Sequence, residues 1–263
     1  MADVSQSAIW NGSEFVPCSG IPVSDRGFRY GMSLFESLAV RGGKAEFLAA
    51  HIARLEAACR RCGWTVDRDA FAASGAWLEA IPGPMFARIY VTAGDGGPAA
   101  PVLAPRILLF AERRGAAGAT DSLRLRIHPE PFLPLLDGLK TANYWANAEA
   151  LRMSRAAGCD EALLLNPRGV LISACMANVF VELDGAWVTP PVSSGARAGV
   201  VREWVMRRRE VRERELSAPD LEKSTACFLT SCWSGVTPVA ALEGRELDTR
   251  FAEELRAEFF NRE

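Results

Sequence analysis

The spacing of apolar residues changes from a strand pattern to a helical pattern near residue 48, and this change restricts the fold most. Before it, strand-like runs at 8–10, 34–40 and 44–48 alternate with turn clusters, which is typical of a sheet built from hairpins. From Leu48 onward the apolar residues step by four and three, so we predict an amphipathic helix that ends before Gly63. Hairpins with segregated helices favour an α+β fold over a regular βαβ array.

A stretch rich in Gly and Ala, residues 113–121, has no apolar periodicity and is the best candidate for a linker. We therefore expect a smaller N-terminal α/β domain at 1–112 and a larger C-terminal domain at 122–263, which carries Lys140. The remaining elements follow from their apolar patterns. They are strands at 87–93, 106–112, 123–127, 161–165, 179–183 and 226–231, and helices at 71–80, 143–157, 200–209 and 219–224.

Charge and cysteine content narrow the class of protein. The 30 basic and 32 acidic side chains leave a net charge of −2, which argues against nucleic-acid binding and membrane-surface binding. No long apolar run or signal peptide is visible, and seven irregularly spaced cysteines suit a reducing cytoplasm better than a disulfide framework. We expect no metal, because a single CxxC pair and two distant histidines do not complete a zinc site.

Lys140 is the strongest candidate for chemistry, because the chain has only three lysines. It lies among apolar residues just before a predicted helix, so its amine is expected to be partly desolvated. Burial lowers the pKa of an ammonium and frees the amine to attack a carbonyl. An ordinary surface lysine is the alternative. Lys44 and Lys223 have hairpin and acidic surroundings that fit a structural role better.

Two loops could bind an anion. The Ser/Gly-rich segment 193–202 leads into a helix whose first N–H groups are free, and segment 230–235 offers hydroxyl and N–H groups after a strand. Together with an arginine, such loops would suit a phosphate. Most Gly-rich helix starts bind nothing, so the loops alone leave the question open.

These residues compose a larger pattern that covers nearly the whole chain. In order and at similar spacing, the chain resembles the class IV aminotransferase family, the fold type IV enzymes that depend on pyridoxal 5'-phosphate (PLP). This family includes branched-chain and D-amino-acid aminotransferases and 4-amino-4-deoxychorismate lyase. The matching blocks are residues 25–31, 34–36, 51–55, 139–144, 160–166, 177–180 and 236–239.

The resemblance implies a two-domain, D-amino-acid aminotransferase-like fold, PLP as cofactor, an amino-acid-like substrate and a homodimer. It implies that Lys140 forms the Schiff base and acts as general acid and base, and that Arg54 binds the cofactor phosphate. Tyr144 is expected to contact the cofactor or the substrate, with a core tyrosine as the alternative. Backbone groups at two helix-start positions and residues of the second loop complete the implied phosphate site: Val200, Val201, Ser231 and Cys232.

One position departs from the family pattern. Ser173 stands where the family has the glutamate that binds the pyridine nitrogen. A carboxylate there keeps that nitrogen protonated and the ring a strong electron sink, whereas a hydroxyl does not. Our hypothesis is that Ser173 penalises transamination more than β-elimination. The sequence therefore favours elimination of the 4-amino-4-deoxychorismate lyase type, with amino-acid transamination or a non-catalytic PLP-binding homologue as alternatives.

A second departure concerns the substrate carboxylate. Ala93 stands where an arginine commonly follows the threonine of this strand in the family. The carboxylate of a substrate thereby loses one expected partner. Arg29, Arg88 and Arg197 are possible substitutes, and the sequence does not rank them.

Overall fold

The computed structural model describes residues 5–115 and 122–262, which divide into two compact units. The first contains the described residues of Met1–Ala116 together with Lys140–Asn143, and the second contains those of Ala117–Leu139 and Tyr144–Glu263. Hairpin-built sheets and separate helices make up both units, so the α+β prediction is confirmed. The domain borders expected from the sequence differ at one place, because Lys140 groups with the first unit.

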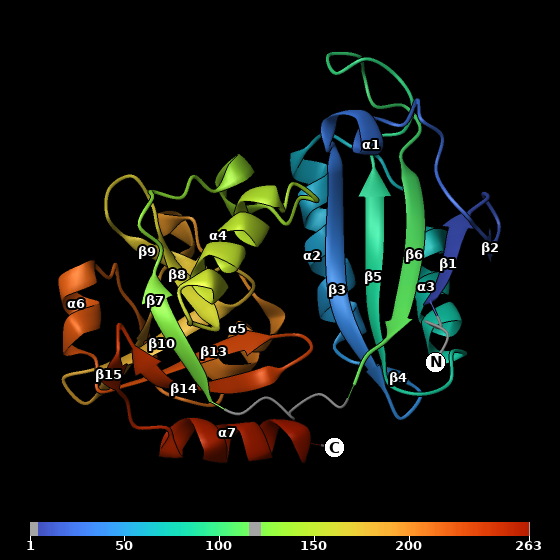
Figure 1. Cartoon of the computed structure of the whole chain (residues 1–263). Helices are drawn as coiled ribbons and strands as arrows, with labels where there is room; N and C mark the ends of the chain where they lie inside the picture. Colours follow the sequence, from blue (N-terminus) through green and yellow to red (C-terminus); the bar gives the residue numbers. More distant parts are fainter. Residues whose placement is uncertain (1–4, 116–121, 263) are drawn as a thin grey trace. The chain divides into compact units, whose positions relative to one another are not determined.

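The first unit is built on a sheet whose six described strands follow the order β2-β1-β6-β5-β3-β4 (Figure 1). Its central strands pair antiparallel, and their Leu, Ile, Val and Ala side chains alternate between the two faces. The bounds are β1 Ser5–Trp10, β2 Phe15–Pro17, β3 Ser33–Arg41, β4 Lys44–Ala45, β5 Met85–Thr92 and β6 Arg106–Arg113. The strand expected at 44–48 is thus shorter, because Leu48 already begins a helix.

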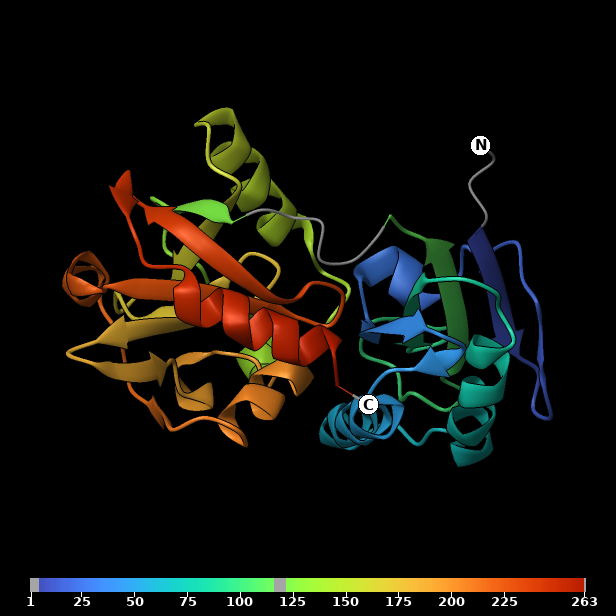
Figure 2. The same cartoon turned by 90° about the horizontal axis from the view of Figure 1, so that it is seen from below.

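Helices α2 (Leu48–Arg61) and α3 (Arg68–Glu79) lie on the same face of this sheet (Figure 2). In α2 the apolar stripe buries Leu55 and Cys59. Gly63 follows the helix with a φ of 71°, the left-handed conformation that glycine adopts most easily. A short helix α1 (Arg26–Tyr30), capped by the Asp25 side chain, was not predicted because its turn is too short for a periodic signal.

The residues around Lys140 extend the edge of the first sheet. The backbone N–H of Phe35 donates to the Lys140 carbonyl at 2.9 Å, and the N–H of Ala142 donates to the Ser33 carbonyl at 2.9 Å. Thr141 forms an antiparallel bridge with Leu34. These backbone bonds explain why residues 140–143 belong to the first unit despite following the linker.

The second unit has a larger, curled sheet in the order β12-β11-β10-β13-β14-β7-β8-β9, with β15 beside β14. Its core contains Leu, Val and Phe side chains from the central strands. The bounds are β7 Leu123–Ile127, β8 Glu161–Leu165, β9 Leu171–Ala174, β10 Asn178–Leu183, β11 Ala186–Thr189, β12 Val211–Glu213, β13 Ala226–Ser231, β14 Gly235–Leu242 and β15 Arg245–Glu246. Strands β7, β8 and β13 coincide with their predicted ranges.

Four α-helices are described in the second unit: α4 Trp145–Ala156, α5 Val200–Met206, α6 Ala218–Lys223 and α7 Arg250–Phe260 (Figure 1). Helix α5 is shorter than the predicted 200–209, and α7, which packs against β14, was not predicted. A 3-10 turn at Leu135–Gly138 precedes Lys140. Among the described residues, no helix is long and apolar enough to cross a membrane.

Candidate functional site

Lys140 lies beside an aromatic pair on one face of the first sheet. Its Nζ is 4.2 Å from the centre of the Phe35 ring, and Phe35 stacks on Tyr90 with ring centres 5.5 Å apart. The side chain of Lys140 is half-buried. The predicted partial desolvation of this amine therefore agrees with its surroundings.

Arg88 shares this face of the sheet. It lies directly opposite Ser37 in the β3–β5 ladder, and Phe35 lies opposite Tyr90 two positions along. Residues two apart on a strand point to the same face, so Arg88 and the Phe35 ring under Lys140 are on the same side. Its guanidinium lies 4.9 Å from the Phe86 ring and forms no ion pair within residues 5–115 and 122–262.

Arg54 lies at the opposite face of β3, where a buried carboxylate holds it. Its Nε donates to Glu36 Oε1 at 2.7 Å and its Nη2 to Oε2 at 2.5 Å, while His51 Nδ1 is 2.8 Å from Oε2. Burial disfavours ionisation of the Glu36 carboxyl, but Arg54 and His51 outweigh it and lower the pKa from 4.5 to about 2. Glu36 therefore stays ionised and fixes the orientation of the guanidinium.

In the second unit, Tyr144 precedes α4 and its hydroxyl accepts a hydrogen bond from Arg197. The Arg197 guanidinium also lies 5.1 Å from the centre of the Tyr144 ring. Tyr144 is half-buried, so the alternative of a fully buried core tyrosine does not describe it. The Arg197 guanidinium thus contacts Tyr144 through both a hydrogen bond and its ring. Arg29 lies over the ring of Tyr30 on α1.

The start of α5 is shaped by a close approach to β10. Val200 and Val201 are its first two residues and are buried, so they offer backbone N–H groups rather than side-chain donors. Asn178 Nδ2 donates to the Arg197 carbonyl at 2.8 Å. A Cβ atom on Gly199, the residue that caps α5, would lie 2.0 Å from Asn178 Oδ1, so only glycine fits there.

The second predicted loop begins at the end of β13. Ser231 Oγ accepts a hydrogen bond from the Ser234 N–H at 3.1 Å, and Cys232 is half-buried. Thr230 lies opposite Asn178 in the β10–β13 ladder, so the two side chains share a face. Asn178 therefore lies beside both Thr230 on β13 and the start of α5, so these two segments are on the same face of the sheet.

Ser173 is half-buried on β9, opposite Leu164. Glu161, on the paired strand β8, is a buried acid that could in principle compensate. Its Oε1 accepts hydrogen bonds from the N–H groups of Ala162, at 3.1 Å, and Cys175, at 3.0 Å. Burial raises the pKa of the Glu161 carboxyl. Because its oxygen already caps the turn after β9, Glu161 has a structural role and does not replace the missing glutamate.

Buried polar atoms without a hydrogen-bond partner mark both sets of predicted phosphate-binding residues. In the first unit His51 Nε2 has no partner in the described chain, and His51 lies one helical turn before Arg54. In the second unit Thr230 Oγ1 has none, and Thr230 precedes Ser231. Buried polar groups are nearly always satisfied, so such atoms fit a polar ligand. The residues present therefore suit a cofactor phosphate.

Sequence reasoning gave no role to Glu36 and His51, which hold Arg54, or to Glu161. Glu36 could have been singled out from the sequence, because it is the one acid in a mostly apolar strand. Glu161 gave no comparable signal, since an acid at the first position of a strand is common. Among the described residues, no group of three or more His, Cys, Asp or Glu side chains could hold a metal ion.

Curated relatives extend over most of the chain. A putative branched-chain-amino-acid aminotransferase from Methanocaldococcus jannaschii is 25% identical over 88% of this chain and 85% of its own. An aminodeoxychorismate lyase from Vibrio harveyi is 25% identical over 88% of this chain and 90% of its own.

A solved structure agrees in fold and in sequence. The 4-amino-4-deoxychorismate lyase from Pseudomonas aeruginosa aligns with a TM-score of 0.81 and 29% identity, over 97% of each chain. The family model for amino-transferase class IV matches residues 33–242, which include Lys140 and Arg54. Enzymes of this family depend on PLP, which is therefore the cofactor of this chain. The chain belongs to the class IV amino-transferase family of PLP-dependent enzymes.

Proposed function

We propose that this enzyme breaks a bond at the amino-bearing carbon of a carboxylated amine, with elimination of the 4-amino-4-deoxychorismate lyase type as its reaction. The observation that carries the proposal is the Lys140 amine, half-buried over the Phe35 ring on a sheet face that also bears Arg88. This gives one nucleophilic amine and one carboxylate-binding guanidinium on the same face. Both lyases and aminotransferases are found among the relatives.

We propose that Lys140 binds the aldehyde of the cofactor and that Arg54, held by Glu36, binds its phosphate. We assign the remaining phosphate contacts to the N–H groups that begin α5 and to the loop after β13, that is Val200, Val201, Ser231 and Cys232. Tyr144 and Ser173 are proposed to contact the pyridine ring.

When bound, PLP supplies an electron-withdrawing ring that stabilises negative charge at the substrate carbon next to the amine. The Lys140 amine would act as the base that removes the proton from that carbon and as the acid that later returns one. Arg88 would bind the substrate carboxylate through its fork of N–H donors. Among the three arginines left open by the sequence, it shares its sheet face with Lys140, whereas Arg197 is bonded to Tyr144.

The preference for elimination rests on Ser173. A serine hydroxyl at the pyridine nitrogen leaves that nitrogen unprotonated, which weakens the stabilisation of carbanionic charge. Transamination must also place a proton on the cofactor carbon, so it depends more on that charge being delocalised. The 29% identity to the Pseudomonas aeruginosa lyase adds support from sequence. Transamination of a branched-chain or D-amino acid is the second candidate, supported by the Methanocaldococcus jannaschii relative.

We also propose that the enzyme is a cytoplasmic homodimer. Large apolar side chains are exposed in each unit, for example Phe28 at 66% and Leu103 at 87% in the first and Trp145 at 87% in the second. Exposed apolar side chains mark an association surface where they form a contiguous patch, which the proposed dimer requires of such residues. Seven free cysteines suit a reducing compartment. Light scattering on the purified chain would measure its mass, and a monomer would refute the dimer.

The test begins with the visible spectrum of the purified chain with added PLP, before and after borohydride, followed by peptide mapping. We expect PLP fixed on Lys140 and no fixed PLP in Lys140→Ala. A wild-type chain that binds PLP only noncovalently would favour the non-catalytic homologue. The loaded enzyme is then assayed with 4-amino-4-deoxychorismate for pyruvate release, and with L-leucine or D-alanine plus 2-oxoglutarate for amino transfer.

Ser173→Glu tests the choice between reactions. We expect the variant to raise the ratio of transamination to elimination, because a carboxylate restores protonation of the ring nitrogen. Ser173→Ala serves as the matched control, since it removes the hydroxyl without adding charge. An unchanged ratio in Ser173→Glu would contradict the role given to Ser173.

A further inference from the structure

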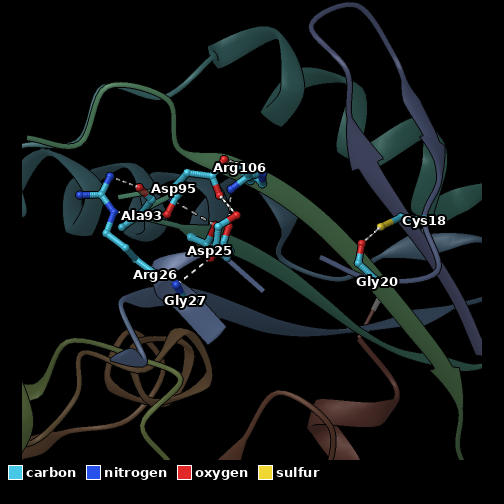
Figure 3. Close-up of polar contacts among 11 residues, drawn as sticks. Cys18, Gly20, Asp25, Arg26, Gly27, Ala93, Asp95 and Arg106 are labelled. Carbon is cyan, nitrogen blue, oxygen red and sulfur yellow. Dashed lines mark hydrogen bonds and ion pairs between the residues drawn. The ribbon is translucent and has the colours of Figure 1, made fainter. Parts of the chain in front are cut away.

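The guanidinium of Arg26 is buried in the first unit and surrounded by backbone carbonyls of a single loop. Figure 3 shows one of these contacts, to Ala93. Arg26 begins α1 and is only 1% exposed. Its Nη1 donates to the Ala100 carbonyl at 2.8 Å and its Nε to the Gly94 carbonyl at 3.2 Å. Further bonds reach the carbonyls of Ala93, Gly97 and Pro101.

A fully buried arginine is usually paired with a carboxylate. Arg26 forms no such ion pair in the part of the chain that the structure describes. Its acceptors are main-chain oxygens of the loop 93–101, which contains neither helix nor strand. An irregular segment turns several carbonyls toward one point only if something holds them there. The planar fork of five N–H donors supplies that constraint, which an ammonium cannot reproduce.

The glycine content of this loop follows from the same arrangement. Gly96 has a φ of 133°, which other residues rarely adopt, and a Cβ there would lie 3.4 Å from Arg26 Cζ. Gly94 has a φ of 65°, and a Cβ there would lie 2.2 Å from the Ala104 carbonyl oxygen. The loop is therefore shaped to close around the guanidinium.

Two carboxylates, Asp25 and Asp95, lie on either side of Arg106 and share its guanidinium, as Figure 3 shows. The buried Asp25 accepts hydrogen bonds from Thr92 Oγ1 and Arg106 Nη1, both at 2.7 Å. Asp95 accepts from Ser24 Oγ at 2.7 Å and from Arg106. Hydrogen bonding from Arg106 lowers the pKa of Asp95, so this acid stays ionised near neutral pH. The end of β5 and the start of β6 are thus tied to the segment before α1.

Hydrogen bonds continue from the loop to the segment that carries Lys140. The Ala93 N–H donates to the Met32 carbonyl at 2.9 Å, and the Met32 N–H donates to the Arg26 carbonyl at 3.2 Å. Asn143 Nδ2 donates to the Gly31 carbonyl at 2.9 Å. Thr92 also shares the sheet face of Phe35, on which Lys140 lies. The loop, α1 and the Lys140 segment are therefore one bonded set at the end of that face.

We propose that Arg26 is a positioning residue that holds the loop 93–101 in one conformation at the end of the Lys140 face and so sets the affinity for substrate. Arg26 itself touches neither reacting atom. The part concerning substrate rests on the proposed function, whereas the part concerning the loop does not. Loosening the loop is expected to weaken substrate binding more than turnover, because Lys140 keeps its own backbone bonds to β3.

The test compares Arg26→Lys, Gly96→Ala and the control Arg68→Lys with the wild-type full-length chain. Arg26→Lys keeps the charge but loses the fork of donors, and Gly96→Ala disturbs the loop while leaving Arg26 in place. Arg68 is 84% exposed in the same unit and controls for the change from arginine to lysine. Amide hydrogen exchange of peptides covering 93–101 and 140–143 is measured without PLP. The KM and kcat of the loaded enzyme are then measured with the substrate identified above.

We expect at least about tenfold faster exchange in 93–101 for Arg26→Lys and Gly96→Ala, with no change for Arg68→Lys. KM should rise about tenfold while kcat changes less than about threefold. Unchanged exchange would overturn the positioning role, and faster exchange with an unchanged KM would overturn its link to substrate. If the wild-type chain lacked activity, the proposed function and the substrate part would both fail. Exchange would still decide whether Arg26 holds the loop.

Discussion

The Glu36→Gln variant tests how the Glu36–Arg54–His51 cluster stabilises the first unit. Glu36 is 2% exposed at its side chain and receives hydrogen bonds at 2.8 Å or less from both partners. A glutamine keeps the shape but loses the charge, and its NH2 group faces donors. Arg54 is half-exposed, so water can hydrate its guanidinium in the variant. The loss of folding stability therefore comes mainly from the missing carboxylate charge.

The magnitude follows from the pKa of the carboxyl. A fall from 4.5 in the unfolded chain to about 2 in the folded chain corresponds to about 3 kcal/mol of stability from ionised Glu36. Because the folded pKa is lowered, this contribution is fully present above about pH 4.5 and is lost as the pH falls toward 2. At pH 3.5 it should have decreased to about 2 kcal/mol.

The assay is urea unfolding of the PLP-free wild-type and Glu36→Gln chains at pH 7 and at pH 3.5. The loss of stability is the free energy of unfolding of the wild type minus that of the variant. Glu56→Gln is the matched control, because Glu56 pairs with the exposed Arg60 and Arg68. That control should lose less than about 1 kcal/mol. A Glu36→Gln loss below about 1 kcal/mol at pH 7, or a loss equal at both pH values, would refute the reasoning.

Three further variants test individual contacts. Thr230→Val removes a buried hydroxyl without a partner, so the PLP-free chain should gain about 1 kcal/mol while PLP affinity, measured by absorbance titration, falls about fivefold. Unchanged affinity would argue against a phosphate contact. Arg88→Met should raise the KM for a carboxylated substrate at least about tenfold without changing PLP affinity, and an unchanged KM would exclude Arg88 as its partner. Gly199→Ala places a Cβ against Asn178, so the melting temperature should fall, with about 1–3 kcal/mol lost; an unchanged melting temperature would contradict this close fit.

Much of the fold followed from periodicity. Strands β7, β8 and β13 and helix α2 lie where the apolar pattern placed them, because each buries one face against a neighbour. The short elements were predicted poorly. Helix α1 depends on the Asp25 cap and strand β4 on pairing with β3, and neither contains a repeating apolar pattern. Long-range pairing explains the assignment of residues 140–143 to the first unit, which no local signal contains.

For the candidate site, the sequence supplied residues and the structure supplied their partners. Lys140 stood out because lysine is rare in this chain, and its place over Phe35 fits a partly desolvated amine. The carboxylate that holds Arg54 and the carbonyls that surround Arg26 are separated from those arginines along the chain. Such contacts depend on the packing of strands and helices, so spacing alone could not reveal them.

The return of residues 140–143 to the edge of β3 has a consequence for synthesis of the chain. While the ribosome has made only the first 116 residues, the segment that bonds to the Ser33 carbonyl and the Phe35 N–H has not yet been synthesised. Open strand edges recruit other chains. A nascent chain therefore exposes this part of the β3 edge from the completion of β6 until Asn143 has been synthesised. A fragment that ends at residue 116 should accordingly aggregate more than the full-length chain.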